Sequence, residues 1–363
     1  MMITHNKKIL KGLTLEELQS FCSEEGEPKY RAKQIFSWMY GHLAESFDEM
    51  QNLPKPLRKK LTEISSLNTL KYVTSEISSS TGTKKYIFET AEGNRIESVL
   101  IPESRRNTLC ISTQAGCPLD CKFCATGLMG YKKNLLAGEI FDQYKLAAKD
   151  NEEMKITNIV YMGMGEPLLN FYETIKSLKI FSDELTIGIS PRRITLSTAG
   201  IAPKIMELAD SGIKVKLALS LHSCFEDIRS KIMPVNKKYS LKENIEAIKY
   251  YTKKTHTKIT FEYIMFKDIN DRKEDIKALT KLCRSLPGKV NVIPFNSLEH
   301  MNPEGVSAKL LPSSVERINK FVNELKGNGI TVMLRNTQGD DIAAACGQLA
   351  YPQTPFQRKG AFK

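Results

Sequence analysis

The sequence lacks several features that define special classes of protein. It has no apolar run long enough to cross a bilayer, since stretches such as 213–221 fall well short of about 20 residues. Residues 1–12 carry lysines but no apolar core of the kind found in secretion signals, so we expect a cytoplasmic protein with no membrane partner. Internal repeats and low-complexity segments are also absent, which argues against a solenoid or a disordered chain.

The eight cysteines lack the regular spacing of a secreted disulfide framework. Three of them, Cys117, Cys121 and Cys124, fall in one short loop with no fourth cysteine nearby. A structural zinc ion takes four protein ligands, whereas an iron-sulfur cubane held by three cysteines leaves one iron open to another molecule. We therefore interpret the C-x-x-x-C-x-x-C pattern as an iron-sulfur loop, with a zinc loop as the alternative.

Charge and length leave room for an enzyme that acts on a large anionic substrate. The 53 basic and 41 acidic residues give a net charge of +12, which favours a polyanionic partner such as RNA but does not by itself identify one. The 363 residues, 41% of them hydrophobic, are enough for one large α/β domain and a smaller one.

The N-terminal part of the chain predicts a small helical unit. Thr14 and Glu17 have the spacing of a capping box, and Gly26 ends the helix that they start. Further helices are expected over 30–40 and 57–64. The basic side chains of the last helix form either a solvated face or a face that contacts RNA.

Strand patterns dominate the rest of the chain. An antiparallel meander is expected from strands over 72–77, 85–89 and 95–101, which turn residues separate. Further strands, each followed by a helical stretch, are expected over 108–113, 156–162, 193–197, 215–221, 258–264 and 289–293. Six such units predict a parallel α/β sheet that right-handed crossovers curl into an open, partial (β/α)6 barrel, with ligand sites at the C-terminal strand ends.

Polar residues and glycines gather at these expected strand ends. The cysteine loop follows the first strand of the barrel, and the turn with Gly165 and Glu166 follows the second. The later strands end at Ser197, at Ser220, Leu221 and His222, and at Asn296. Each residue alone is explained as a turn former or helix cap, so only their joint placement on one rim indicates a ligand site. The Glu166 carboxylate is suited to an ammonium group.

Several motifs together resemble the RlmN/Cfr family of radical S-adenosylmethionine (SAM) RNA adenine methyltransferases. They are TLCISTQ at 108–114, GMGEPLLN at 163–170, LSTAG at 196–200, SLH at 220–222 and GDDIAAACGQL at 339–349. The stretch GEPKYRAKQIF at 26–36 resembles the RlmN branch in particular. The resemblance covers nearly the whole chain. Ser223, Cys224 and Phe225 depart from the family pattern, and Cys224, like Cys22 and Cys283, is assigned no catalytic role.

The resemblance and the patterns together predict four parts. A helical accessory domain that binds RNA covers 1–70, a β-meander linker covers 71–104, and a radical SAM partial barrel covers 105–345. A C-terminal segment, 346–363, carries a methyl-accepting cysteine.

The resemblance also implies the cofactors and the chemistry. Cys117, Cys121 and Cys124 hold a 4Fe-4S cluster, and SAM, two molecules per turnover, lies against the strand-end residues. Cys346 accepts a methyl group, which becomes a carbon radical and attacks the adenine. Glu97 is the proton acceptor, and Cys110 releases the product by forming a transient disulfide with Cys346.

The function that follows is the formation of 2-methyladenine in 23S rRNA at the peptidyl-transferase centre, with tRNA next to the anticodon as a further substrate. A flavodoxin-type protein is the implied electron donor. Two alternatives remain: methylation at adenine C8, as in the Cfr branch, and a zinc-binding ribosome-assembly factor without catalysis.

Overall fold

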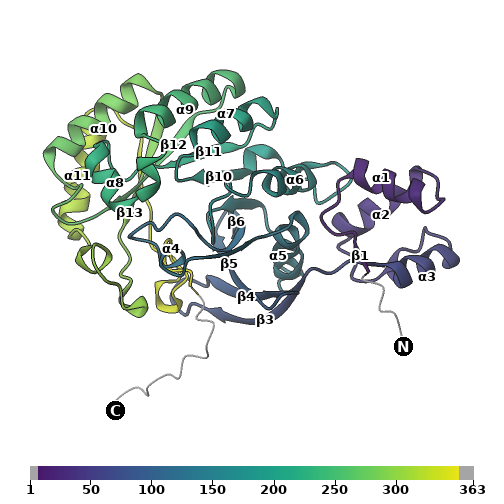
Figure 1. Ribbon diagram of the computed structural model, residues 1–363. Helices are drawn as coiled ribbons and strands as arrows, with labels where there is room; N and C mark the ends of the chain where they lie inside the picture. The colour runs from purple at the N-terminus through teal and green to yellow at the C-terminus, as the bar shows by residue number, and fades with distance from the viewer. Residues whose placement is uncertain (1–6, 351–363) are drawn as a thin grey trace, which may run out of the picture.

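The computed structural model describes residues 7–350, so 1–6 and 351–363, the outer ends of the predicted accessory domain and C-terminal segment, lie outside the described residues. A small helical unit lies beside a large α/β body (Figure 1). The unit contains α1 (Leu15–Glu24), α2 (Tyr30–Tyr40), the 3-10 turn η1 (Phe47–Glu49), α3 (Lys55–Ile64) and the parallel strands β1 (Lys8–Ile9) and β2 (Ser65–Ser66).

Local signals set the bounds of these helices. The Thr14 hydroxyl accepts a hydrogen bond from the Glu17 amide at 3.3 Å, and the Glu17 carboxylate accepts one from the Thr14 amide at 2.8 Å. This capping box satisfies amide groups that the first turn leaves without partners. Gly26, with φ of +76°, follows the helix end, because its left-handed backbone suits a residue without a Cβ. The predicted capping box and helices are confirmed.

A ten-stranded mixed sheet forms the body, in the order β14-β13-β12-β11-β10-β9-β6-β5-β4-β3. Its antiparallel part contains β3 (Leu70–Ile77), β4 (Lys84–Thr90), β5 (Arg95–Glu103) and β6 (Arg106–Cys110). From β6 onward the neighbours are parallel: β9 (Asn158–Tyr161), β10 (Ile194–Thr198), β11 (Lys216–Ser220), β12 (Ile259–Met265), β13 (Gly288–Pro294) and β14 (Val332–Leu334). The meander is therefore continuous with the barrel sheet.

Helices cover the outer side of the curved parallel sheet (Figure 1). They are α5 (Ala137–Lys149), α6 (Phe171–Ser182), α7 (Ala202–Asp210), α8 (Glu226–Ile232), α9 (Leu241–Thr255), α10 (Lys273–Ser285) and α11 (Val315–Gly327). A hairpin of β7 (Gln114–Gly116) and β8 (Tyr131–Asn134), with α4 (Ala125–Leu128) between its strands, follows β6. Shorter 3-10 turns are η2 (Pro191–Arg193), η3 (Pro234–Lys237), η4 (Glu299–Met301), η5 (Ser307–Lys309) and η6 (Asp340–Ile342).

The predicted fold class, an α/β partial barrel with an N-terminal helical unit and a β-meander, is confirmed. All six expected barrel strands form, and every residue of β12 is buried, as in a parallel strand covered on both faces. Among the described residues the structure adds β14, which at three residues is too short to give a periodic signal in the sequence. No helix within residues 7–350 has both the length and the apolar character needed to span a bilayer.

A buried charge cluster joins the helical unit to the barrel. Asp142 of α5 is fully buried and accepts hydrogen bonds from the amide of Thr69 at 2.8 Å and from its hydroxyl at 2.7 Å. The ammonium groups of Lys11 and Lys145 lie 3.7 and 3.5 Å from the other carboxylate oxygen. Burial lowers the pKa of Lys11 to about 8, against the attraction of Asp142. The cluster fixes the position of the helical unit because each buried charge needs the others.

We predict that Asp142→Ala lowers the free energy of unfolding by about 3–5 kcal/mol, because it leaves two buried ammonium groups without a counter-charge. Urea unfolding followed by circular dichroism measures the loss. Lys249→Ala is the control, since Lys249 forms an exposed ion pair with Glu246 on α9 and should leave the unfolding midpoint unchanged. Equal midpoints for the two variants would show that the cluster does not anchor the helical unit.

Candidate active site

The cysteine loop follows β7, and its entry is fixed by backbone geometry. Gly116 has φ of +74°, and a Cβ at this position would lie only 1.9 Å from the carbonyl oxygen of Gly130. That same oxygen accepts a hydrogen bond from the Cys117 amide at 3.1 Å. Farther along, Asp120 takes a left-handed conformation with φ of +51°. The loop thus depends on residues that tolerate positive φ and close backbone contact.

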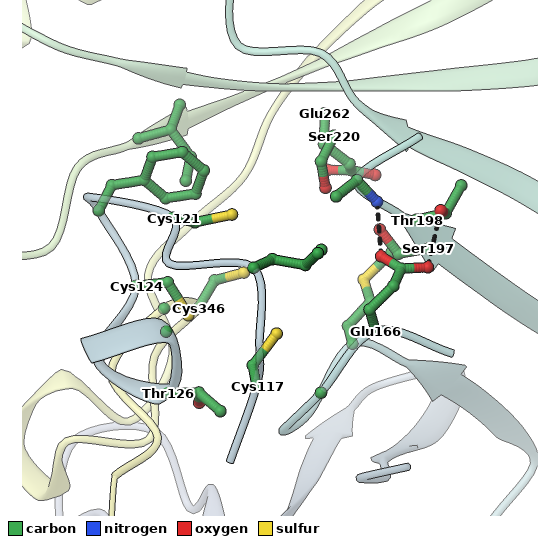
Figure 2. Close-up of a pocket in the computed structure, with 18 of the residues that line it drawn as sticks. Cys117, Cys121, Cys124, Thr126, Glu166, Ser197, Thr198, Ser220, Glu262 and Cys346 are labelled. Atoms are coloured by element: carbon green, nitrogen blue, oxygen red, sulfur yellow. Dashed lines mark hydrogen bonds between the residues drawn. The ribbon is translucent and has the colours of Figure 1, made fainter. Parts of the chain in front are cut away.

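The thiols of Cys117, Cys121 and Cys124 line one cavity (Figure 2). Burial raises the pKa of all three thiols, that of Cys117 to about 12, so a positive metal charge is needed to hold them as thiolates. Three soft sulfur donors from one loop fit a cluster with three protein ligands and one open iron. The residues present are therefore suited to a 4Fe-4S cluster.

Glu166 lies in the wall of the same cavity and is held by neighbouring strand ends (Figure 2). Its Oε1 accepts hydrogen bonds from the Thr198 hydroxyl at 2.7 Å and the Leu168 amide at 3.0 Å, and its Oε2 accepts one from the Ala199 amide at 2.7 Å. Gly165, with φ of +97°, packs against Gln114 where no Cβ would fit. Burial raises the carboxyl pKa, and these donors oppose the rise. A carboxylate has further lone pairs for an ammonium group of a ligand.

The structure places other predicted strand-end residues around this cavity. Ser197 and Ser220 line it, with Ser220 close to Glu262 of the next strand (Figure 2). His222 also lines it, and its Nδ1 accepts a hydrogen bond from the Ile264 amide at 3.0 Å. Burial, with the charge of Arg229, lowers the pKa of His222 to about 3, so the imidazole is neutral.

Leu221 is different, because its side chain is fully buried and does not line the cavity. Any contact that Leu221 makes with a ligand would come from its backbone.

Arg229 of α8 holds the ends of two strands together. It is fully buried, and its guanidinium donates hydrogen bonds to the carbonyl oxygens of Ala199 at 2.6 Å, Ser220 at 3.1 Å and Leu221 at 3.2 Å. It also donates to the side chain of Asn236. These bonds fix the backbone that carries the serines and the histidine, so Arg229 is a positioning residue of the rim.

Cys346 and Cys110 meet at a second, small cavity, which Asn296 and Arg335 also line. Cys346 lines both cavities and therefore lies between the cysteine loop and Cys110. The Asn296 amide donates to the Cys346 carbonyl oxygen at 3.0 Å. Burial raises the pKa of the Cys346 thiol, and the positive charge of Arg335 opposes that rise. Burial also raises the pKa of Cys110, to about 12.

Glu97 of β5 is buried and lines neither of these two cavities. Its Oε1 lies 3.6 Å from the ammonium group of Lys85, which in turn donates to the carbonyl oxygen of Ile342 at 2.5 Å. Burial raises the carboxyl pKa to about 7, and Lys85 limits the rise. Lys85 thus links the carboxylate to η6, four residues before Cys346.

Sequence reasoning missed four polar residues of the site, Arg229, Arg335, Glu262 and Lys85. Arg335 follows the unpredicted strand β14, and Arg229 looks like an ordinary charged residue of an amphipathic helix. Glu262 and Lys85 stand on predicted strands, where a polar residue among apolar ones was the available signal.

Comparisons with known proteins agree with this geometry. A family model described as the radical SAM superfamily matches residues 111–282, and one described as the N-terminal domain of the ribosomal RNA large subunit methyltransferase matches 9–67. This chain is similar to the solved structure of a radical SAM methyltransferase from Sphaerobacter thermophilus, with a TM-score of 0.86 and 41% sequence identity. The match covers 94% of this chain and 98% of that one. The fold and the cysteine loop therefore define a radical SAM enzyme.

Sequence relatives give the family. A probable dual-specificity RNA methyltransferase RlmN from Dictyoglomus turgidum is 45% identical over 92% of this chain and 94% of its own length. The dual-specificity RNA methyltransferase RlmN from Alcanivorax borkumensis is 40% identical over 96% of this chain and 91% of its own. The chain belongs to the RlmN family of radical SAM RNA methyltransferases. Members of this superfamily use SAM and a 4Fe-4S cluster, in agreement with the donor set above.

We predict that replacing Cys117, Cys121 or Cys124 with Ala prevents cluster assembly, because two thiolates cannot hold the iron-sulfur core. Anaerobic reconstitution followed by iron analysis should give about four iron atoms per wild-type chain and close to none in each variant. Cys283→Ala is the control. Cys283 is buried in α10 and does not line the cavity of the cysteine loop, so this variant should keep the full iron content. Full iron content in a loop variant would contradict the assignment.

Proposed function

We propose that this enzyme forms 2-methyladenine in 23S rRNA, at the peptidyl-transferase centre, and in tRNA next to the anticodon. The observation that carries the proposal is the position of Cys346, which lines both the cavity of the cysteine loop and the cavity that contains Cys110. The names of the relatives, dual-specificity RNA methyltransferases, support two kinds of RNA substrate. They also leave the alternative of a non-catalytic zinc-binding factor without support.

The target atom explains why two further cysteines are needed. Adenine C2 is an electrophilic carbon without a nucleophilic lone pair, so it cannot attack the methyl group of SAM directly. A 4Fe-4S cluster held by Cys117, Cys121 and Cys124 would supply the electron that cleaves SAM to a 5′-deoxyadenosyl radical. The protein must then present a carbon that can become a radical and add to C2.

Cys346 is suited to present that carbon. Its thiolate accepts a methyl group from one SAM, since the thiolate is the nucleophilic form and the charge of Arg335 favours it. The 5′-deoxyadenosyl radical takes a hydrogen atom from the S-methyl group, and the methylene radical that remains bonds to C2. The adduct must then lose the C2 proton and one unpaired electron, for which the oxidised cluster would be the acceptor. The base is then covalently linked to Cys346 through one methylene group.

Cys110 is suited to release the product. Its thiolate attacks the Cys346 sulfur, so that an S–S bond forms while the bond between sulfur and the methylene carbon breaks. The electrons of the broken bond stay with the methylene carbon, which takes a proton and becomes the new methyl group. Both thiols line the same cavity in the structure, and this proximity supports the exchange.

Glu97 is the proposed acceptor of the C2 proton. A base must be ionised to work, and burial keeps the pKa of Glu97 near 7, where both forms are populated at neutral pH. Lys85 stabilises the carboxylate and, through the Ile342 carbonyl, ties it to the segment that carries Cys346. The same thiol chemistry serves C8, so the product must be identified by mass spectrometry of digested RNA against 2- and 8-methyladenosine standards.

Our prediction for Cys110→Ala is a permanent RNA adduct on the enzyme, because nothing remains to attack the Cys346 sulfur. A denaturing gel with and without ribonuclease detects the adduct, and mass spectrometry locates it on Cys346. Cys346→Ala is the matched control, since it can accept no methyl group and form no link. An adduct on the Cys346 variant would show that the roles of the two cysteines are reversed. No adduct on a Cys110 variant that retains its iron would refute the mechanism.

The pH dependence of methylation should follow Glu97. Below about pH 7 the carboxylate is increasingly protonated, so the rate should fall about tenfold per pH unit, and above that pH it should level off. Lys85→Met removes the positive charge next to Glu97. The acidic limb of the pH–rate profile should therefore shift to higher pH by about one unit or more. Single-turnover rates across the pH range provide the measurement.

Lys84→Met is the matched control for this profile, because Lys84 pairs with Asp150 and not with Glu97. Its profile should overlay that of the wild type. A profile of Lys85→Met that also overlays the wild type would exclude Glu97 as the titrating base.

A further inference from the structure

Glu97 lies where two strands of the sheet separate. The ladder between β5 and β6 ends at the pair of Val99 and Cys110. The same register, continued by two residues, would bring Glu97 opposite Ser112, which lies beyond the end of β6. The backbone groups of Glu97 on this side of β5 are buried and therefore need partners other than a neighbouring strand.

Two side chains take the place of the strand partner. The Glu97 amide donates a hydrogen bond to the Met164 sulfur at 3.3 Å, and the Ser112 hydroxyl donates one to the Glu97 carbonyl oxygen at 2.6 Å. The same hydroxyl accepts a hydrogen bond from the Met164 amide at 2.8 Å. None of the three residues is more than 2% exposed, so water is not available to replace a lost bond.

The Gln143 side chain of α5 fixes the direction of Ser112. Its Oε1 accepts a hydrogen bond from the Ser112 amide at 2.7 Å, and its Nε2 donates one to the Ser112 carbonyl oxygen at 2.9 Å. The Ser98 hydroxyl donates to the same Oε1 at 2.6 Å. An amide side chain thus pairs with Ser112 as a strand would, which leaves the Ser112 hydroxyl free to hold Glu97.

Met164 belongs to the turn that leads to Glu166, and this turn is held firmly without Glu97. The Glu166 amide donates to Gln114 Oε1 at 2.8 Å, in addition to the bonds of its carboxylate to the neighbouring strand ends. At Gly163 a Cβ would lie only 2.7 Å from Ser112 Oγ, so the turn packs directly on Ser112. Loss of a bond between the turn and β5 is therefore expected to move Glu97 rather than Glu166.

The position of β5 at this point matters for the thiols. Val99, two residues after Glu97, lines the cavity that contains Cys110 and Cys346. Alternate residues of a strand project to the same face, so Glu97 and Val99 share the face of β5 toward this cavity. A proton acceptor must come within hydrogen-bond reach of the carbon-bound proton that it removes, and a small shift of β5 would change that distance.

We propose that Ser112 and Met164 are positioning residues for Glu97. Through the two hydrogen bonds to its backbone they hold the proton acceptor in a fixed place relative to the turn of Glu166. Both the SAM-derived radical and the proton acceptor must reach the same adenine, and a misplacement of about 1 Å can slow such a step about a hundredfold. This inference rests on the proposed function and adds to it two residues that act through Glu97.

The test uses the full-length, reconstituted enzyme and an RNA fragment whose target adenine carries either hydrogen or deuterium at C2. Ser112→Ala and Met164→Leu should each slow the formation of 2-methyladenine about tenfold in single turnovers. The deuterium isotope effect should be larger than in the wild type, because proton removal has become the slow step. The iron content and the rate of 5′-deoxyadenosine formation should stay at the wild-type level, since neither depends on Glu97.

Ser98→Ala and Met265→Leu are the matched controls. Ser98 is also fully buried on β5, but its hydroxyl bonds to Gln143 and not to the backbone of Glu97. Met265 is fully buried on β12 and lines neither cavity that contains Cys346. Both variants should show the wild-type rate and isotope effect.

A wild-type rate in Ser112→Ala or in Met164→Leu would overturn the role of that residue. An equal loss of iron, of 5′-deoxyadenosine and of 2-methyladenine would also overturn it, because it would show damage to the whole site rather than to proton removal.

Failure of the proposed function gives a different result. A wild-type enzyme that forms 8-methyladenine would refute the function, and the same comparison with deuterium at C8 would then decide the positioning role. A wild-type enzyme that methylates neither carbon would refute both.

Discussion

Two hydrogen bonds that hold the C-terminal segment on the cysteine loop are the constraint on which the site depends. The Ala125 amide donates to the Gly347 carbonyl oxygen at 2.7 Å, and the Thr126 hydroxyl donates to that of Leu349 at 2.6 Å. They bring Cys346 from the far end of the chain to the cavity lined by Cys117, Cys121 and Cys124. Because α4 begins directly after Cys124, the same short helix fixes both the loop and the position of Cys346.

Burial of charge is the second recurring feature, and it costs stability unless each charge is paired. Arg229 satisfies this condition with the carbonyl groups of two strand ends, and Asp142 satisfies it with Thr69 and two lysines. In both places the buried group joins segments that are distant in the sequence. Such groups stabilise one arrangement of the rim and of the helical unit, since any other arrangement would leave a buried charge without a partner.

Motifs predicted the fold class and brought most of the candidate site together, because each motif residue lies at the end of a strand whose pattern is visible. The cysteine loop, Glu166 and Ser220 belong to this group. Arg229, Arg335 and Glu262 do not, because their roles depend on which strands are neighbours and on the direction of each side chain. The pairing of Glu262 with Asn291 across β12 and β13 is a matter of register, and no local pattern reveals it.

The two ends of the barrel differ in what covers them. A reactive carbon radical must be kept from water, and the end with the cysteine loop is covered by the C-terminal segment. The other end is open to solvent and polar, and Lys216 and Lys289 stand there with Glu103 and Glu262. Cys346 lines the two cavities toward the covered end, and Arg335 lines these and also the cavity at the strand starts. A partial barrel permits this separation, because its strands carry one set of inward side chains at their start and another at their end.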